Sequence, residues 1–170
     1  MDLQKYVREI PDFPEEGISF KDITPLLQDA SALAGAADAL FQLVQDIKVD
    51  KVVGMESRGF FFAPLLATRL NAGFVPVRKR GKLPHQIISE PYALEYGTDV
   101  LEIHVDSILK GEKVLVHDDV LATGGTAQAV CKLVEKLGGE VVQCNFLLEL
   151  TFLKGRGKLC GYPVGALMQY

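Results

Sequence analysis

The stretch that most constrains this chain is residues 114–126, where a short apolar run ends in two adjacent aspartates and a turn of small residues. Val-Leu-Val-His precedes Asp118 and Asp119, and Val-Leu-Ala-Thr-Gly-Gly-Thr follows them. The pattern predicts a buried strand that leads through a tight turn into a helix, because residues 126–137 carry apolar side chains at helical spacing. Such a unit favours an α/β protein with a parallel sheet.

Short apolar runs and amphipathic segments alternate along most of the chain. Apolar residues recur at helical spacing over 31–47, and Ser31 is the expected N-cap. Further helices are predicted over 64–70 and 126–137, and strands over 51–55, 74–77, 101–105, 114–117 and 141–148. This alternation predicts a mostly parallel central sheet flanked by helices, whose ligands bind at the carboxyl ends of the strands.

Length and charge limit the classes of protein to consider. A chain of 170 residues predicts one domain over 1–170, with a Pro-punctuated N-terminal arm over 1–30 and a weakly periodic flap over 80–100. The net charge of −4 provides no global basic field, so we expect no nucleic-acid partner. Three cysteines argue against a disulfide framework or a zinc site. A charged N-terminus and the lack of a long apolar run predict no membrane contact and a cytoplasmic location.

The small-residue turn is suited to a phosphate monoester. Backbone N–H groups at the start of a helix converge at the positive end of its dipole, where they can donate to phosphate oxygens. The residues expected to form this cradle are Ala122, Thr123, Gly124, Gly125 and Thr126. Asp118 and Asp119 would accept hydrogen bonds from the vicinal hydroxyls of a ribose. A capped helix with exposed acids is the alternative interpretation, and a Walker A loop is excluded because no Lys follows the second Gly.

Two further groups of cations follow predicted strands and would lie at the same sheet edge. Arg58 and Ser57 come after the strand over 51–55, and Arg58 is either a diphosphate ligand or a surface residue in a turn. Four cations lie within residues 78–82, directly after the strand over 74–77. Such a run is either a solvated patch or an anion-capturing site.

Together these motifs resemble the type I phosphoribosyltransferase family, in its adenine-specific branch. The acid-rich stretch resembles the family's phosphoribosyl diphosphate motif, and the supporting segments occur in the family's order, over residues 13–25, 56–60, 77–84, 94–97 and 149–151. The resemblance covers nearly the whole chain. His117 departs from the pattern, because the family commonly has a small apolar residue there.

The resemblance implies the type I phosphoribosyltransferase fold, with a flexible flap and a small hood. It also implies transfer of a phosphoribosyl group from 5-phosphoribosyl 1-diphosphate to adenine, which gives AMP and diphosphate in purine salvage. The implied cofactor is Mg²⁺, held mainly by substrate and water with no direct protein ligand, and the implied assembly is a homodimer.

The resemblance assigns site residues in three groups. Ser57, Arg58, Lys79, Arg78 and His85 would bind the diphosphate. Ser19, Phe20, Lys21 and Leu150 would bind the base, although composition alone favours Phe20 as a core residue. Glu95 and Arg58 would be the catalytic residues, with Glu95 in the flap as the proton acceptor, and Tyr96 would screen the reaction centre from water. The alternatives are a 6-oxopurine phosphoribosyltransferase and a non-catalytic regulator that senses purines or phosphoribosyl diphosphate.

Overall fold

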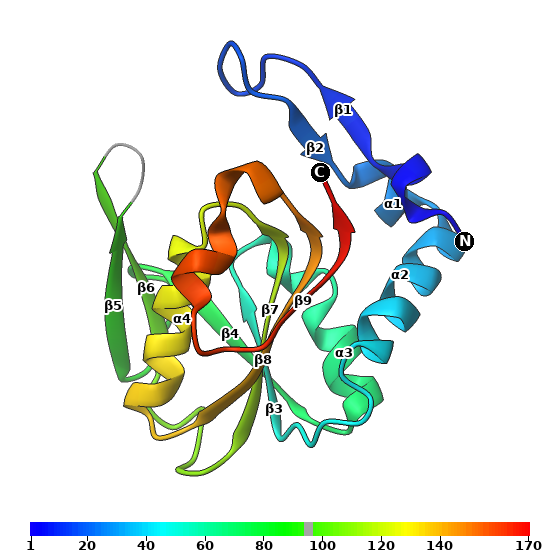
Figure 1. Cartoon of the computed structure of the whole chain (residues 1–170). Coiled ribbons are helices and arrows are strands. Elements are labelled where there is room, and N and C mark those ends of the chain that lie inside the picture. Colours follow the sequence, from blue (N-terminus) through cyan, green and yellow to red (C-terminus); the bar gives the residue numbers. More distant parts are fainter. Residues whose placement is uncertain (94–96) are drawn as a thin grey trace. The chain divides into compact units, whose positions relative to one another are not determined.

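The computed structural model describes residues 1–93 and 97–170 (Figure 1). The described residues form two compact units, Met1–Ala39 and Leu40–Tyr170. The boundary falls within helix α2 (Ala30–Gln42).

The smaller unit begins with a 3₁₀ turn, η1 (Leu3–Tyr6), and a two-stranded antiparallel ribbon. Strand β1 (Arg8–Ile10) pairs with β2 (Phe20–Asp22), so that Ile10 lies opposite Phe20. The short helix α1 (Thr24–Gln28) follows and leads into α2. Part of the predicted N-terminal arm is therefore a strand, β2, and its partner is β1.

Helix α2 differs from its predicted bounds at both ends. It begins at Ala30, and its cap is Asp29, whose Oδ1 accepts a hydrogen bond from the Ala32 amide at 2.8 Å; the prediction of Ser31 as N-cap is wrong. It ends at Gln42, where the predicted helix continued to Ile47. The Ile47 amide instead donates to the Val44 carbonyl, three residues earlier, at 3.0 Å, which is the hydrogen bond of a 3₁₀-type turn. Apolar spacing persists through these turns, so periodicity alone could not locate the end of the helix.

The larger unit is built on a seven-stranded sheet with the order β5-β6-β4-β3-β7-β8-β9. Its strands are β3 (Lys51–Met55), β4 (Gly73–Lys79), β5 (Ile87–Ala93), β6 (Thr98–His104), β7 (Lys113–Leu121), β8 (Glu140–Glu149) and β9 (Val164–Gln169). The five strands from β4 to β9 pair in parallel, and β5 and β6 pair in antiparallel fashion. The mostly parallel α/β sheet predicted from the sequence is confirmed.

The connections place helices on both faces of this sheet. Helix α3 (Ala63–Leu70) joins β3 to β4, and α4 (Gly125–Lys136) joins β7 to β8 (Figure 1). The two crossovers run in opposite directions from neighbouring strands, so right-handed connections put their helices on opposite faces. The direction in which the chain crosses the sheet therefore reverses between β3 and β7. The carboxyl ends of these two strands border a topological switch point, where open α/β sheets bind ligands.

The predicted flap over 80–100 contains a hairpin of β5 and β6. Ile87 lies opposite His104, and Ala93 lies opposite Thr98. The sequence predicted β6 but not β5, because Pro91 interrupts its pattern. Proline is tolerated here because β5 is an edge strand and needs no inward N–H at that position.

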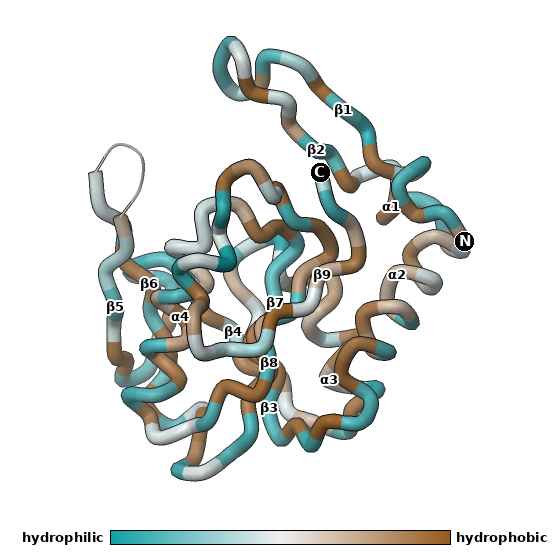
Figure 2. Tube along the Cα trace, viewed as in Figure 1, coloured by the Kyte–Doolittle hydropathy of each residue, from teal (hydrophilic) through white to brown (hydrophobic). Residues whose placement is uncertain are grey.

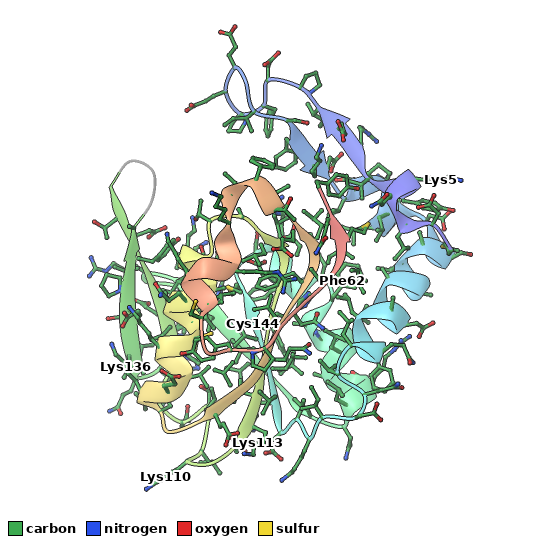
Figure 3. All side chains as sticks on the ribbon, in the orientation of Figure 1. Lys5, Phe62, Lys110, Lys113, Lys136 and Cys144 are labelled. Atoms are coloured by element: carbon green, nitrogen blue, oxygen red, sulfur yellow. The ribbon has the colours of Figure 1, made fainter. Side chains whose placement is uncertain are left out.

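The core lies between the sheet and its helices. Hydrophobic residues follow the central strands, and Figure 2 shows them along β8. Phe62 and Cys144 lie among the packed side chains, whereas Lys110 and Lys136 project from the surface (Figure 3). The buried thiols of Cys131 and Cys144 are 3.5 Å apart, and both are free, as is Cys160.

Candidate active site

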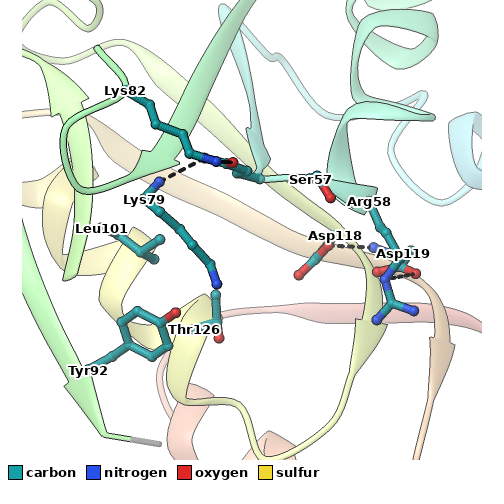
Figure 4. Close-up of a pocket in the computed structure, with 10 residues that line it drawn as sticks. Ser57, Arg58, Lys79, Lys82, Tyr92, Leu101, Asp118, Asp119 and Thr126 are labelled. Carbon is teal, nitrogen blue, oxygen red and sulfur yellow. Dashed lines mark hydrogen bonds and ion pairs between the residues drawn. The ribbon is translucent and has the colours of Figure 1, made fainter. Parts of the chain in front are cut away.

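A cavity of about 400 Å³ opens at the carboxyl ends of β3, β4 and β7, beside the hairpin (Figure 4). Most of its lining is polar or charged. The lining residues are Glu56, Ser57, Arg58, Lys79, Lys82, Tyr92, Leu101, Asp118, Asp119 and Thr126. The cavity therefore brings the predicted acids, the predicted cations and the cradle threonine to one place.

The two aspartates project differently from the end of β7. Asp119 is 2% exposed, and its Oδ2 lies 3.2 Å from Nε of Arg58. Asp118 is half-buried, and its Oδ1 accepts a hydrogen bond from the Asp119 amide at 2.9 Å (Figure 4). Burial raises the pKa of both carboxyls, and the charge of Asp119 raises that of Asp118 further, while Arg58 opposes the rise. Arg58 thus keeps the inner carboxylate in place beside the cavity.

A smaller cavity of about 60 Å³ lies against the turn between β7 and α4. It is lined by Asp118, Val120, Leu121, Ala122, Thr123, Gly124, Thr126, Ala127 and Phe146. Gly124 has a φ of +81°, and a Cβ at this position would collide with the Gly155 carbonyl oxygen. Only glycine fits this turn without strain. The predicted phosphate cradle is therefore a concave turn that opens beside the acids.

The side of the cavity next to β4 is organised around Glu56. Its carboxylate accepts a hydrogen bond from the Lys79 amide at 2.9 Å and pairs with the ammonium of Lys82 and with Nε of Arg78, the latter at 3.4 Å. Burial alone would raise the pKa of Glu56, but the hydrogen bonds from Lys82 and the Lys79 amide, with the nearby cations, hold it below its usual value. The Glu56–Ser57 peptide bond is cis.

Lys79 reaches the opposite wall of the cavity. Its Nζ lies 3.5 Å from Oδ2 of Asp99, which also accepts a hydrogen bond from the Tyr92 hydroxyl at 3.1 Å. Burial and the Asp99 carboxylate raise the pKa of Tyr92 to about 12. The hydroxyl is therefore a neutral donor at physiological pH, and Lys79 and Tyr92 together could meet an anion in the cavity.

The structure does not bring every predicted site residue to this cavity. Arg78 contacts Glu56 from outside the lining, and Nε2 of His85 lies 4.0 Å from Asp106. Leu150 follows β8, and its amide donates to the Leu121 carbonyl at 2.9 Å, close to the cradle. Glu95 and Tyr96 lie outside the described residues.

The three residues predicted to bind the base from the arm lie in the smaller unit. The Phe20 ring packs edge-on against Phe13, with ring centroids 5.2 Å apart. Nζ of Lys21 donates to Glu9 at 2.6 Å and to Oγ of Ser19 at 3.2 Å.

Sequence reasoning missed four residues of the lining. Glu56 and Lys82 were noted only as parts of motifs, and Tyr92 and Leu101 were given no site role. A carboxylate that immediately precedes Ser57 and Arg58, with four cations downstream, is a signal that could have identified Glu56. Nothing in the local pattern places Tyr92 and Leu101 here, because their position depends on the pairing of the hairpin with β4.

Neither a metal cluster nor a membrane helix occurs in the part of the chain that the structure describes. Across residues 1–93 and 97–170, no three His, Cys, Asp or Glu side chains gather as metal ligands. Within the same ranges, none of the helices combines the length and the apolar character that crossing a bilayer requires.

A doubly wound sheet with twin aspartates, a Gly-Thr cradle and converging cations at its switch point defines a class of α/β protein that binds phosphorylated sugars. Residues 23–157 match the phosphoribosyl transferase domain family. The adenine phosphoribosyltransferase of Christiangramia forsetii is 65% identical over all 170 residues, which cover 99% of that protein. The chain thus belongs to the phosphoribosyltransferase family, among the adenine phosphoribosyltransferases.

Solved structures of the family share the whole fold. The adenine phosphoribosyltransferase of Rhodothermus marinus superposes with a TM-score of 0.94 at 55% identity, with 99% of this chain and 96% of that chain covered. The Saccharomyces cerevisiae enzyme, solved with adenine and an imino-altritol bisphosphate, gives a TM-score of 0.91 at 43% identity, with 96% and 94% covered. The predicted type I phosphoribosyltransferase fold and family are confirmed.

Proposed function

We propose that this chain converts adenine and 5-phosphoribosyl 1-diphosphate to AMP and diphosphate, as a purine salvage enzyme whose two units, over 1–170, act as one transferase domain. The observation that carries the proposal is the cavity at the switch point, where Asp118 and Asp119 adjoin both the cradle and the cations Arg58 and Lys79. A phosphorylated pentose with a diphosphate at its other end matches this order of groups. Relatives at up to 65% identity that carry the name adenine phosphoribosyltransferase support the choice of base.

The chemistry assigns a separate task to each side of the site. The cradle from Ala122 to Thr126 binds the 5′-phosphate, and Asp118 and Asp119 accept hydrogen bonds from the ribose hydroxyls. Ser57, Arg58 and Lys79 bind the diphosphate, while Arg78 supports this region through Glu56. Departure of the diphosphate leaves positive charge on the ribose, so catalysis consists mainly of neutralising the leaving group and positioning the base opposite to it.

The base site is proposed to consist of Ser19, Phe20, Lys21 and Leu150. The Phe20 ring would stack on adenine and Leu150 would cover its other face, while backbone groups of Ser19 and Lys21 would read its edge. A 6-oxopurine presents the opposite donor and acceptor pattern there. It would leave a buried polar group without a partner, which costs about 1–3 kcal/mol.

Phosphoribosyltransferases generally use Mg²⁺, and the site fits the ion if it arrives with the substrate. Asp118 and Asp119 provide carboxylate oxygens beside the cavity, and Oδ2 of Asp119 accepts no hydrogen bond from the residues that the structure describes. These two side chains would hold the hydrated ion from its outer shell. When bound, Mg²⁺ neutralises diphosphate charge and keeps several of its waters, as is usual for this ion.

The flap and the assembly complete the proposal. Closure of the segment over 80–100 would exclude water, with Glu95 accepting a proton from adenine, Tyr96 screening the reaction centre and His85 approaching the diphosphate. A homodimer is supported by exposed apolar side chains in the segment that runs from β3 through α3 into β4, namely Phe61, Leu65 and Phe74. The enzyme would work in the cytoplasm on small molecules, without nucleic-acid or membrane partners.

The decisive experiment is product analysis. Purified protein is mixed with Mg²⁺ and 5-phosphoribosyl 1-diphosphate, together with adenine, guanine, hypoxanthine or xanthine in turn, and the nucleotides are separated by chromatography. We expect AMP to form with adenine and little product to form with the 6-oxopurines. Product from guanine or hypoxanthine alone would indicate a 6-oxopurine enzyme, and no product from any base, with intact substrate binding, would indicate a regulator.

A further inference from the structure

The phosphate cradle lacks a positive charge of its own. Its five residues, 122–126, carry only backbone amides, hydroxyls and hydrogen or methyl side chains, and the nearest acids are Asp118 and Asp119. The 5′-phosphate of the substrate carries up to two negative charges near neutral pH. A cation outside the cradle would therefore strengthen binding of this group.

Lys158 lies beside the first turn of α4. It belongs to η4 (Gly155–Leu159), and its Nζ is 3.6 Å from the point that a Cβ on Gly125 would occupy. Oγ1 of Thr123, in the wall of the cradle, is 4.0 Å from the same point. The ammonium and the cradle hydroxyl therefore border the same turn. A third cavity, of about 160 Å³, separates Lys158 from β5 and is lined in part by Gly125 and Gln128.

Three contacts fix the backbone that carries Lys158. Nε2 of Gln128, on α4, donates to the Lys158 carbonyl at 3.0 Å. Gly155 packs directly against the carbonyl of Ala122, where a Cβ would not fit. The guanidinium of Arg156 donates from Nε and Nη2 to the buried carboxylate of Glu149 at 2.8–2.9 Å. The start of the side chain is thus held, while its four-carbon stem can turn.

The ammonium group of Lys158 is available to a ligand. Among the ion pairs that join described residues, none includes Lys158, whereas two lysines of α4 pair with Glu90. Those pairs are Lys132 at 3.5 Å and Lys136 at 2.6 Å. Within residues 1–93 and 97–170, the Lys158 ammonium therefore has no carboxylate partner, whereas Lys132 and Lys136 share Glu90.

We propose that Lys158 is a substrate-binding residue that supplies positive charge to the 5′-phosphate of 5-phosphoribosyl 1-diphosphate across the first turn of α4. The inference rests on the proposed function and adds a residue to its phosphate site. A flexible ammonium suits this role, because it can follow the phosphate into the cradle without fixing its geometry, which the backbone amides set.

The test compares Lys158→Gln with Lys158→Arg and with the control Lys132→Gln. The control removes a lysine that lines the same third cavity and has a half-exposed side chain, but whose ammonium already pairs with the Glu90 carboxylate. Steady-state assays give kcat and the KM for each substrate. Inhibition by ribose 5-phosphate and by inorganic diphosphate then separates the two charged ends of the substrate.

For Lys158→Gln we expect KM for 5-phosphoribosyl 1-diphosphate to rise about fivefold to tenfold, with kcat within about twofold of wild type. Inhibition by ribose 5-phosphate should weaken by a similar factor, and inhibition by diphosphate should not change. Lys158→Arg and Lys132→Gln should behave like wild type. Unchanged KM in Lys158→Gln, or equal weakening of both inhibitors, would overturn the inference.

The inference can fail separately from the proposed function. If wild-type protein forms no AMP, calorimetric titration with ribose 5-phosphate still tests Lys158, because that probe needs only the phosphate site. Weaker binding to Lys158→Gln than to Lys132→Gln supports the inference in that case, and equal binding contradicts it. Far-ultraviolet circular dichroism of each variant checks that the fold is intact.

Discussion

At the scale of single residues, the two neighbouring aspartates at the end of β7 have different surroundings. Asp119 is almost fully buried and ion-paired with Arg58, whereas Asp118 is half-buried and hydrogen-bonds the next amide. Arg58 and Asp119 both line the cavity and form an ion pair, so this pair joins the parts of the cavity that we propose bind the ribose and the diphosphate. Replacing either acid should therefore affect more than one contact with the substrate.

Asp119→Asn should weaken binding of 5-phosphoribosyl 1-diphosphate by about tenfold or more, because it removes a charged acceptor and releases Arg58. Isothermal titration calorimetry with Mg²⁺ present measures the Kd. Asp46→Asn is the matched control, since Asp46 is an exposed acid outside the cavity lining. Equal affinities for the two variants would show that Asp119 does not contact the ribose.

Glu95→Gln should lower kcat by about 100-fold or more, the usual size of a general-base contribution, while leaving the Kd for 5-phosphoribosyl 1-diphosphate within about twofold. The amide keeps the shape of the side chain but cannot accept the proton of adenine. Rapid-quench assays of a single turnover measure the chemical step directly. A single-turnover rate equal to that of wild type would remove Glu95 from the mechanism.

At the scale of elements, the cradle depends on a close contact between two segments far apart in the sequence. The turn before α4 packs against the start of η4, so that Gly124 and Gly155 meet backbone to backbone. The Glu149–Arg156 ion pair ties the same η4 segment to the end of β8, and Arg156 also donates to the Val164 carbonyl at 2.9 Å. The cradle is thus held from outside by the segment that follows β8.

Gly124→Ala should destabilise the protein and weaken phosphate binding together. The left-handed φ costs a non-glycine residue about 1–2 kcal/mol, and the added Cβ would also displace the Gly155 carbonyl. Urea unfolding measures the free energy of unfolding, and titration with ribose 5-phosphate measures binding. Gly157→Ala is the control, because a Cβ there meets nothing within 4 Å. If both variants bind and unfold alike, the contact with Gly155 does not shape the cradle.

Local pattern predicted some elements well and others poorly, for identifiable reasons. Strands β3 and β8 are nearly continuous apolar runs, as buried parallel strands usually are, and the sequence located both. Strand β5 was not predicted, because this edge strand contains a proline and polar residues and shows no regular alternation of apolar and polar side chains. No pattern predicted β9. The acids and the cradle were identified because they are contiguous in sequence. Tyr92 was missed because pairing between strands brings it to the cavity.

At the scale of the whole molecule, the stability of the fold should depend on pH through buried groups that lie under the site. Burial lowers the pKa of His117 to about 4, against an unfolded value of 6.5, although its Nδ1 lies 3.0 Å from Oδ1 of Asn145. Burial raises the pKa of Asp118 and Asp119, so protonation of these acids in the folded state stabilises the fold as pH falls. The histidine and the two acids therefore have opposite effects below neutral pH.

The effect of His117 can be isolated by comparing wild type with His117→Leu. Between pH 6.5 and 4 the unfolded chain binds a proton at residue 117 that the folded protein does not bind, so the free energy of unfolding falls as pH decreases. From pH 7.5 to 5, this histidine should cost wild type about 2 kcal/mol that the variant does not lose. Urea unfolding at both pH values measures the change within each protein.

Contributions of the acids are common to both proteins and cancel in the comparison, whereas the loss of the Asn145 partner shifts the variant equally at both pH values. Equal changes in the two proteins would mean that His117 is protonated as readily in the fold as in the unfolded chain.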